Sequence, residues 1–217
     1  NFAGVAPIMI RMAASGETIT IDGLGVWPAL AHVEHFEKEF NGAIPEGLKR
    51  TVVPAAPAAW ITALQRYGTC SFKDVAQYAC RYAREGFPVF PVFAQFIAEN
   101  QNAYRRTAAT AAIYLPGGRP PDVGDIFVQS DLAGTMIDES EAAGGSREVG
   151  LQAAYDAFYR GDIAETICAY HEANGGFLRR QDMAAYKPRI EPPVRVAYKD
   201  AEILACGPWC QGISLAQ

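Results

Sequence analysis

Alternating apolar and polar positions at the two ends of the chain predict two β-hairpins. Apolar side chains alternate with other residues over 8–12 and again over 19–21, and Ser15-Gly16 supplies the turn between them. The same alternation covers 194–198 and 203–205, on either side of Lys199-Asp200. A period of two places the apolar side chains of each strand on one face. We therefore expect strands at the beginning and at the end of the chain.

Helical spacing of apolar residues fills the region between these hairpins. One helix is predicted to start at Pro28, a residue that a first helical turn tolerates, and to end at Asn41-Gly42. Another begins after Ser71, with Val75, Tyr78, Ala79 and Tyr82 as its expected inner stripe. Further helices are expected over 57–67, 93–105, 151–159 and 162–173 and after Asp131. Prolines and glycines make 116–121 an expected irregular loop.

The order of these elements predicts the fold class. Strands at both ends with about seven helices between them favour an α+β fold over an alternating βαβ arrangement. No internal repeat, low-complexity tract or dividing linker is present in the sequence. We therefore expect one domain over 1–217.

Composition and charge narrow the classes of partner. Half of the 217 residues are hydrophobic and 20% are charged, as in ordinary globular proteins. The net charge of −5 disfavours nucleic acid and anionic membrane surfaces as partners. No apolar run approaches the roughly 18 residues of a membrane span. The expected location is cytoplasmic, or periplasmic or secreted if a signal segment has been removed.

Three clusters of reactive side chains have ordinary structural explanations. Cys206 and Cys210 are separated by three residues, whereas redox dithiols have two, so a packing or turn role is favoured. His32 and His35 share a predicted helix face without an evident third metal ligand, which favours a solvated charged face. The carboxylates of Asp138, Glu139 and Glu141 are expected on a solvated helix face.

The sequence offers no nucleophile of a familiar hydrolase type. No G-x-S-x-G elbow occurs, and the chain has only three histidines, none with matching serine and aspartate partners. A globular chain of this size without a candidate nucleophile is expected to be one part of an enzyme that another chain completes.

Seven sequence pieces in a fixed order give the chain a family resemblance. They are Thr20-Ile-Asp-Gly with Pro28-Ala; Val52-Val-Pro with Trp60 and Arg66-Tyr-Gly; Arg84-Glu-Gly-Phe-Pro-Val; Tyr114-Leu-Pro with Gln129-Ser-Asp-Leu-Ala; Phe158-Tyr-Arg-Gly-Asp-Ile-Ala; Asn174-Gly-Gly-Phe-Leu; and Asp182-Met-Ala-Ala-Tyr. In these pieces and their order the chain resembles the large subunit of the γ-glutamyltranspeptidase family, which are N-terminal nucleophile hydrolases.

The resemblance implies a fold and a mechanism. The fold would be a four-layer αββα sandwich, of which residues 1–217 are a fragment of the large subunit. The precursor would cut itself into a heterodimer and expose a threonine at the start of the small subunit, so the catalytic residue is not expected in this chain. The new α-amine would act as the base for its own hydroxyl, so neither a metal nor an organic cofactor is implied. The expected partners are the small subunit of the same precursor and a small-molecule amide.

One departure from the family pattern bears on the substrate. Transpeptidases of the family carry an arginine shortly after the aspartate of the second strand, where it pairs with the α-carboxylate of the γ-glutamyl group. Here Leu24 stands at that position, and Gly25 stands where an acidic residue commonly follows. The nearest basic residues in sequence, Arg11, His32 and Lys38, are outside this loop. A leucine cannot hold a carboxylate, so recognition of a standard γ-glutamyl compound is disfavoured.

Two tryptophans extend this interpretation. Trp209 is a large side chain where the family often has small polar ones, and Trp27 lies on the same loop as Leu24. Leu24, Gly25, Trp27 and Trp209 are therefore the predicted substrate-binding residues, with core packing as the alternative for both tryptophans. The leading hypothesis is an amide hydrolase for a small amide other than a γ-glutamyl compound. Alternatives are a γ-glutamyl enzyme whose carboxylate anchor lies elsewhere, a non-catalytic scaffold, and a redox protein built on Cys206 and Cys210.

Overall fold

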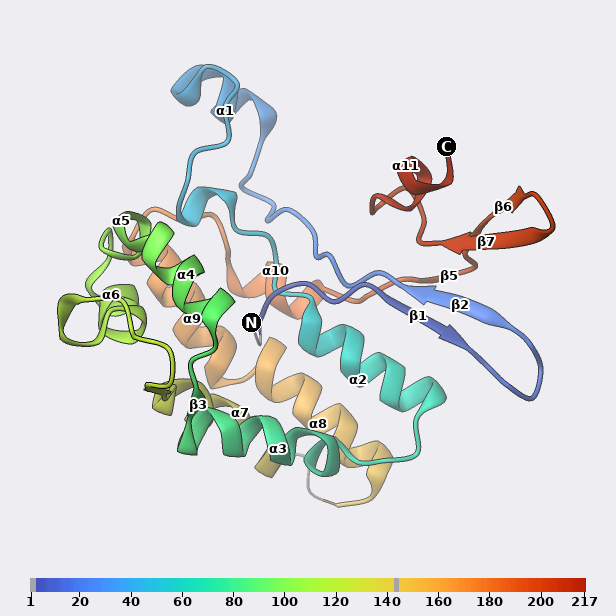
Figure 1. Ribbon diagram of the computed structural model, residues 1–217. Coiled ribbons are helices and arrows are strands. Elements are labelled where there is room, and N and C mark those ends of the chain that lie inside the picture. Colours follow the sequence, from blue (N-terminus) through green and yellow to red (C-terminus); the bar gives the residue numbers. More distant parts are fainter. Residues whose placement is uncertain (1–2, 143–144) are drawn as a thin grey trace. The chain divides into compact units, whose positions relative to one another are not determined.

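The computed structural model describes the backbone of residues 3–142 and 145–217, and the side chains of these residues except those of 137–142. The chain forms two compact units (Figure 1). The first contains Asn1–Phe72 and Ala142–Gln217, and the second contains Lys73–Glu141. That residues 1–217 form a single domain stays a prediction.

The first unit contains a three-stranded antiparallel sheet in the order β1-β2-β5. Strands β1 (Ile8–Arg11) and β2 (Thr18–Ile21) form the predicted amino-terminal hairpin. Strand β5 (Ile190–Glu191) adds to the other edge of β2, with Thr20 opposite Glu191. Two residues give too short a pattern for sequence periodicity to detect, so β5 was not predicted.

Helices cover the apolar side of this sheet. Ile19 and Ile21 of β2 pack against Ala59 of helix α2 (Ala56–Tyr67), as the predicted alternation requires. Helix α2 packs in turn on α8 (Arg147–Tyr159), and α8 packs on α9 (Asp162–Ala173) (Figure 1). Burial of this apolar surface is the main source of stability for the unit.

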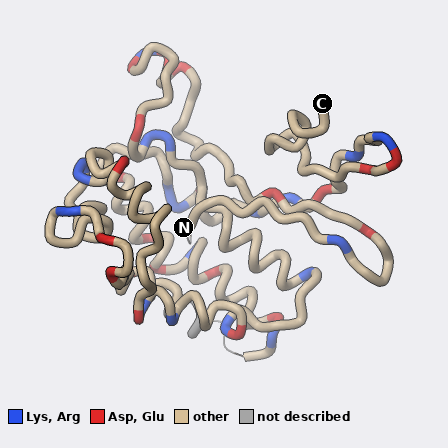
Figure 2. The backbone as a smooth tube through the Cα atoms, in the orientation of Figure 1, with Lys and Arg blue, Asp and Glu red and all other residues tan. Residues whose placement is uncertain are grey.

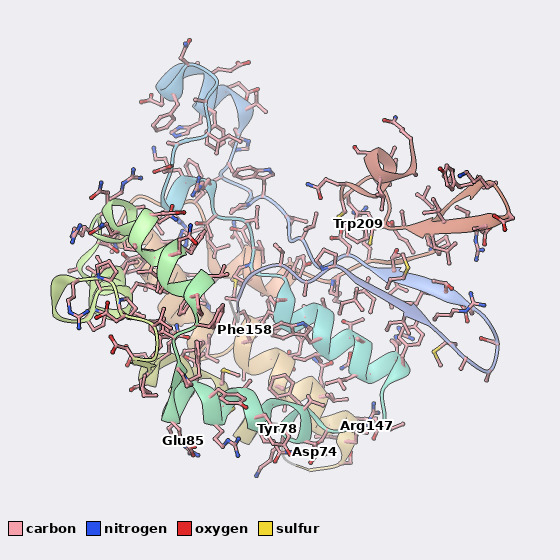
Figure 3. All side chains as sticks on the ribbon, viewed as in Figure 1. Asp74, Tyr78, Glu85, Arg147, Phe158 and Trp209 are labelled. Atoms are coloured by element: carbon pink, nitrogen blue, oxygen red, sulfur yellow. The ribbon has the colours of Figure 1, made fainter. Side chains whose placement is uncertain are left out.

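A buried tyrosine joins α8 to the start of α2. The Tyr159 hydroxyl donates to the Pro54 carbonyl at 2.7 Å and accepts the Ala58 N–H at 3.1 Å. Tyr159 is fully buried beside Phe158, which Figure 3 labels on α8. The hydroxyl of Tyr159 is therefore satisfied inside the core both as a donor and as an acceptor, which avoids the cost of an unpaired buried hydroxyl.

Helix α1 of the first unit is shorter than predicted. Helix α1 is Val33–Phe40, so the prediction that it starts at Pro28 is wrong. The backbone N–H of Ala31 instead bonds to the Pro28 carbonyl in a turn. The second predicted hairpin is confirmed as β6 (Val194–Tyr198) and β7 (Ala201–Ala205). The short elements are a 3₁₀ turn at Leu48–Arg50, α10 at Arg180–Ala185 and α11 at Gly212–Ala216.

The second unit is mainly helical. Its elements are α3 (Phe72–Glu85, which begins at the unit boundary), α4 (Pro91–Glu99), α5 (Gln101–Tyr104), α6 (Ala108–Tyr114), a 3₁₀ turn (Pro116–Gly118), α7 (Ser130–Ala142), and the paired two-residue strands β3 (Phe87–Pro88) and β4 (Ile126–Phe127). The single helix predicted over 93–105 is therefore two helices, and α6 was not predicted.

Helix α3 buries a different face from the predicted one. Its buried residues are Phe72, Ala76, Cys80 and Ala83. The stripe predicted to lie inside is exposed instead, at 47% for Val75, 60% for Tyr78 and 52% for Tyr82. Small residues allow close approach of the helix to its neighbours, whereas a tyrosine can keep its polar end in solvent. Tyr78 and Tyr82 also take part in cation–π contacts with Arg81.

The mixture of helices and short antiparallel strands confirms the predicted α+β class. Basic and acidic positions are interspersed along the backbone of each unit, as Figure 2 shows.

Candidate functional site

The loop that follows β2 is fixed by close backbone contacts. A Cβ atom on Gly23 would lie 2.0 Å from the carbonyl oxygen of Ala6. Gly25 has φ +84°, and a Cβ there would lie 2.2 Å from the carbonyl oxygen of Val53. Only glycine fits both positions, because a side chain would collide with the backbone. The predicted site residues Leu24 and Gly25 therefore lie on a loop that packs closely against the backbone of Ala6 and Val53.

Asp22 organises this loop from inside. Its side chain is buried, and one carboxylate oxygen, Oδ1, accepts the Leu24 N–H at 3.1 Å. The backbone N–H of Asp22 donates to the carbonyl of Arg189 at 2.8 Å. Asp22 thus connects the loop to the segment that leads into β5.

Arg189 forms a fork with the same carboxylate. Its Nε and Nη2 atoms donate to Asp22 Oδ2 at 3.1 and 2.8 Å. These hydrogen bonds raise the pKa of the arginine above its usual value and keep it charged. The local sequence around the loop does not reveal this cation, because Arg189 lies 167 positions from Asp22.

Glu191 and Trp209 continue the contacts of Arg189. Arg189 Nη1 lies 3.5 Å from Glu191 Oε1, and the indole N–H of Trp209 donates to Glu191 Oε2 at 3.0 Å. Figure 3 labels Trp209, in the segment between β7 and α11. We call Asp22, Arg189, Glu191 and Trp209 the loop network.

The charge balance of the loop network limits what it can bind. Two carboxylates surround one guanidinium, so the three ionic groups together carry a net charge of −1. Two N–H groups of Arg189 already donate to Asp22, and its Nη1 faces Glu191 at 3.5 Å. A carboxylate on a ligand would have to compete with both, so this cation is a poor anchor for an anionic group.

Tyr186 and Tyr155 connect the loop to α8 by hydrogen bonds. The Tyr186 hydroxyl donates to the Asp22 carbonyl at 3.4 Å, and the Tyr155 hydroxyl donates to the Tyr186 carbonyl. Burial, and then the charge of Asp22, raise the pKa of Tyr186 well above its usual value. Tyr186 therefore stays protonated as a hydrogen-bond donor.

The structure brings some of the four predicted site residues together. Leu24 and Gly25 lie beside Asp22, and the loop network connects Asp22 to Trp209. The ring of Trp27 lies edge-on to Phe36 of α1, 5.8 Å between centroids, and 45% of the residue is exposed. Contact of any of the four with substrate stays a prediction.

The cysteine pair has the character of a packed turn. Cys206 and Cys210 are both free thiols, and the Cys210 N–H bonds to the Gly207 carbonyl at 3.1 Å. Burial and the neighbouring Cys210 raise the pKa of Cys206. A raised pKa lowers the thiolate fraction that redox exchange requires. This agrees with the favoured packing or turn role and gives no support to the redox alternative.

The predictions for the histidines and for the acidic cluster fare differently when compared with the structure. His35 is partly buried, with its ring edge-on to Phe177 at 5.0 Å and Nε2 at 3.1 Å from the Lys49 ammonium nitrogen. The expected solvated face is therefore confirmed for His32, which is exposed, but not for His35. No cluster of three or more metal-ligating side chains occurs in the described part of the chain. The side chains of Asp138, Glu139 and Glu141 lie outside the described residues.

Comparison with known proteins identifies the family. A model of the γ-glutamyltranspeptidase family matches residues 4–217. The chain belongs to the γ-glutamyltranspeptidase family. It is 32% identical over 211 residues to an acylase ACY 1 proenzyme from Pseudomonas sp. (strain SE83), covering 92% of this chain and 35% of the relative. It is 29% identical over 210 residues to a glutathione hydrolase proenzyme of Bacillus subtilis (strain 168), covering 94% of this chain and 34% of that relative.

Solved structures of the family agree on the fold. The chain superposes on the γ-glutamyltranspeptidase of Helicobacter pylori with a TM-score of 0.86 at 24% identity, covering 98% of this chain and 59% of that one. The predicted N-terminal nucleophile hydrolase fold is thus confirmed. The chain spans about a third of the length of the curated relatives it matches, so it corresponds to a large-subunit fragment. Within the described residues, no helix has the length and apolar character needed to cross a membrane.

Proposed function

We propose that this chain is the large-subunit part of a self-processing amide hydrolase that uses an amino-terminal threonine on the small subunit. The support is membership of a family whose relatives are named as proenzymes. The threonine Oγ would attack the amide carbonyl and pass its proton to the α-amine. The amine product would leave with that proton, and water would then hydrolyse the acyl-enzyme ester.

The substrate is proposed to be a small amide whose acyl group lacks the α-carboxylate of a γ-glutamyl compound. The observation that carries this proposal is Leu24 on the loop after Asp22, where the family resemblance leads us to expect an arginine. Gly25 and Trp27 lie on the same loop. Trp209 is connected to this loop through Glu191, Arg189 and Asp22. These residues would give an acyl pocket more apolar than that of a transpeptidase.

An alternative is a γ-glutamyl enzyme whose carboxylate anchor has moved. Arg189 is the one cation that contacts Asp22 among the described residues, but Asp22 and Glu191 already hold it. This alternative therefore requires an anchor on the small subunit. A second alternative is a non-catalytic scaffold, for which the full-length protein would not cut itself.

The first experiment is intact mass measurement and amino-terminal sequencing of the purified full-length protein. Two fragments, the smaller beginning with threonine, are expected. A single uncut chain that is stable over days would overturn the enzymatic proposal and favour the scaffold.

Acyl preference is then tested with a matched pair of anilides. γ-Glutamyl-4-nitroanilide and 4-aminobutanoyl-4-nitroanilide differ only in the α-carboxylate. We expect kcat/KM for the second to equal or exceed that for the first, and Leu24→Arg to shift the ratio toward the γ-glutamyl compound. A wild-type preference of about tenfold or more for the γ-glutamyl compound would establish the relocated anchor instead.

A further inference from the structure

A basic pocket lies between α2, α8 and the segment that leads into β5. Its volume is about 280 Å³, close to the lower limit of roughly 300 Å³ for organic-ligand pockets. The cavity therefore suits a small molecule or ion. Its lining consists of Thr62, Gln65, Arg66, Gln152, Tyr155, Arg160, Lys187, Pro188 and Ile190.

Three cations line this basic pocket and no carboxylate does. Arg66, Arg160 and Lys187 come from separate segments that the fold brings together. Arg160 forms an ion pair with Asp156 and also donates to the Ala184 carbonyl. In the part of the chain that the structure describes, Arg66 and Lys187 form no ion pair. With Asp156 included, the pocket carries a net charge of +2 in a protein whose overall charge is −5.

The neutral groups of the pocket complement this charge. The Tyr155 hydroxyl donates to Tyr186, and burial raises the pKa of Tyr155, so no phenolate offsets the cations. Gln152 donates to Asp156 Oδ2 at 3.2 Å and is itself uncharged, so it adds no negative charge to the pocket. Thr62 and Gln65 supply further hydrogen-bonding groups on α2.

The basic pocket is distinct from the loop network. Lys187, Pro188 and Ile190 line it, whereas Arg189 and Glu191 do not and instead contact Asp22 and Trp209. Alternate residues of an extended segment point to opposite sides, which accounts for the separation of Pro188 and Ile190 from Arg189 and Glu191. Lys187, at the start of the segment, lines the pocket as well. Arg66 and Lys187 are therefore available to a ligand distinct from that of the loop network, with Arg160 beside them in its ion pair with Asp156.

We propose that this basic pocket binds a small dianion, either an oxyanion of the phosphate type or a short dicarboxylate. Charge-assisted hydrogen bonds from Arg66, Arg160 and Lys187 would hold its oxygens, and the two charges would neutralise the net +2 of the site. The proposal does not depend on the acyl specificity or on the catalytic activity of the protein.

The test is isothermal titration of the full-length protein with inorganic phosphate and, separately, with succinate, at constant ionic strength set with chloride. We expect saturable binding of at least one of them at a single site. R66Q/K187Q should weaken it about three- to twentyfold, given the usual strength of exposed ion pairs. Arg160 is left in place because it also holds Ala184 and Asp156.

Matched controls separate the site from general charge. R195Q/K199Q removes two cations from the β6–β7 hairpin and should leave binding unchanged. R66K/K187R keeps both charges and should retain binding. Saturation by neither anion, or equal weakening by R66Q/K187Q and R195Q/K199Q, would overturn the proposal. The stronger of the two anions identifies which dianion chemistry the pocket prefers.

Discussion

Arg189 holds the buried carboxylate of Asp22 in a two-bond fork, although 167 residues separate them in the chain. The same carboxylate accepts the N–H of Leu24, so one side chain fixes both the shape of the loop and its attachment to β5. The fork therefore connects a candidate specificity loop to a strand that the sequence pattern did not reveal.

Arg189→Gln is expected to destabilise the protein by about 1–3 kcal/mol, because it leaves the buried Asp22 without a countercharge. The cost is below that of a fully buried pair because 61% of the arginine side chain is exposed to screening solvent. Denaturant unfolding of the purified protein measures it.

Arg195→Gln is the matched control for this change. Arg195 pairs with Glu202 at 2.7 Å, but both side chains are about half exposed. Its loss should cost about 0–1 kcal/mol. Equal effects of the two substitutions would show that the Asp22 fork has no special structural role.

Trp209→Phe tests whether the loop network affects substrate. The change keeps an aromatic ring and removes the N–H donated to Glu191. If the proposed acyl pocket is correct, kcat/KM for the preferred anilide should fall by about three- to tenfold, the usual worth of one hydrogen bond. Tyr198→Phe is the control, since it removes a hydroxyl from an exposed aromatic residue of β6 outside the loop network and should leave kcat/KM unchanged. An equal fall in kcat/KM for both variants would show that the loop network has no special role in substrate binding.

Arg147→Gln is expected to loosen the carboxyl end of α2. Arg147, labelled in Figure 3, donates from α8 to the carbonyls of Leu64 and Gly68, the latter at 2.6 Å. The Leu64 carbonyl also accepts the Gly68 N–H at 3.0 Å, so Arg147 adds a second donor there, whereas the Gly68 carbonyl lies past the last turn and has no donor within the helix. A loss of about 1–3 kcal/mol in unfolding free energy is expected. Hydrogen exchange should show faster exchange at the end of α2, whereas an unchanged rate there would contradict this role.

His171 should make stability depend on pH. Burial, and then the charge of Arg179, lower the pKa of this histidine below its usual 6.5. The unfolded chain therefore takes up the proton first as pH falls, so this contribution to stability is full above about pH 6.5 and is lost as pH falls toward the folded-state pKa. Unfolding midpoints measured from pH 7.5 to 5.0 should fall with pH, and His171→Leu should reduce that slope. An identical slope in the variant would assign the dependence to other groups.

Local patterns predicted the elements whose neighbours are close in sequence. The hairpins at 8–21 and 194–205 and helix α2 follow from alternation, turn residues and helical spacing. Apolar content alone failed on α3, where Ala76, Cys80 and Ala83 pack inside while Tyr78 and Tyr82 face solvent. The buried face of α3 is therefore the one whose small side chains let the helix approach its neighbours closely.

The candidate site was predicted in part. The order of the family pieces directed attention to Leu24, Gly25, Trp27 and Trp209, and the structure links Trp209 to the Asp22 loop through Glu191 and Arg189. The contacts of Arg189 with Asp22 and of Glu191 with Trp209 could not be predicted from the sequence, because β5 has two residues and its partner strand lies about 170 positions earlier. Such long-range pairing depends on the whole fold rather than on any local window.

The separation of Asp22 and Arg189 along the chain also sets the order in which parts of the loop become available during synthesis. At roughly 5–20 residues per second, the ribosome makes Arg189 about 8–33 s after Asp22. During this interval the β1–β2 hairpin can form, but its third strand and the countercharge of Asp22 do not yet exist. Completion of the loop must therefore wait until helices α1 to α10 of this chain have been translated.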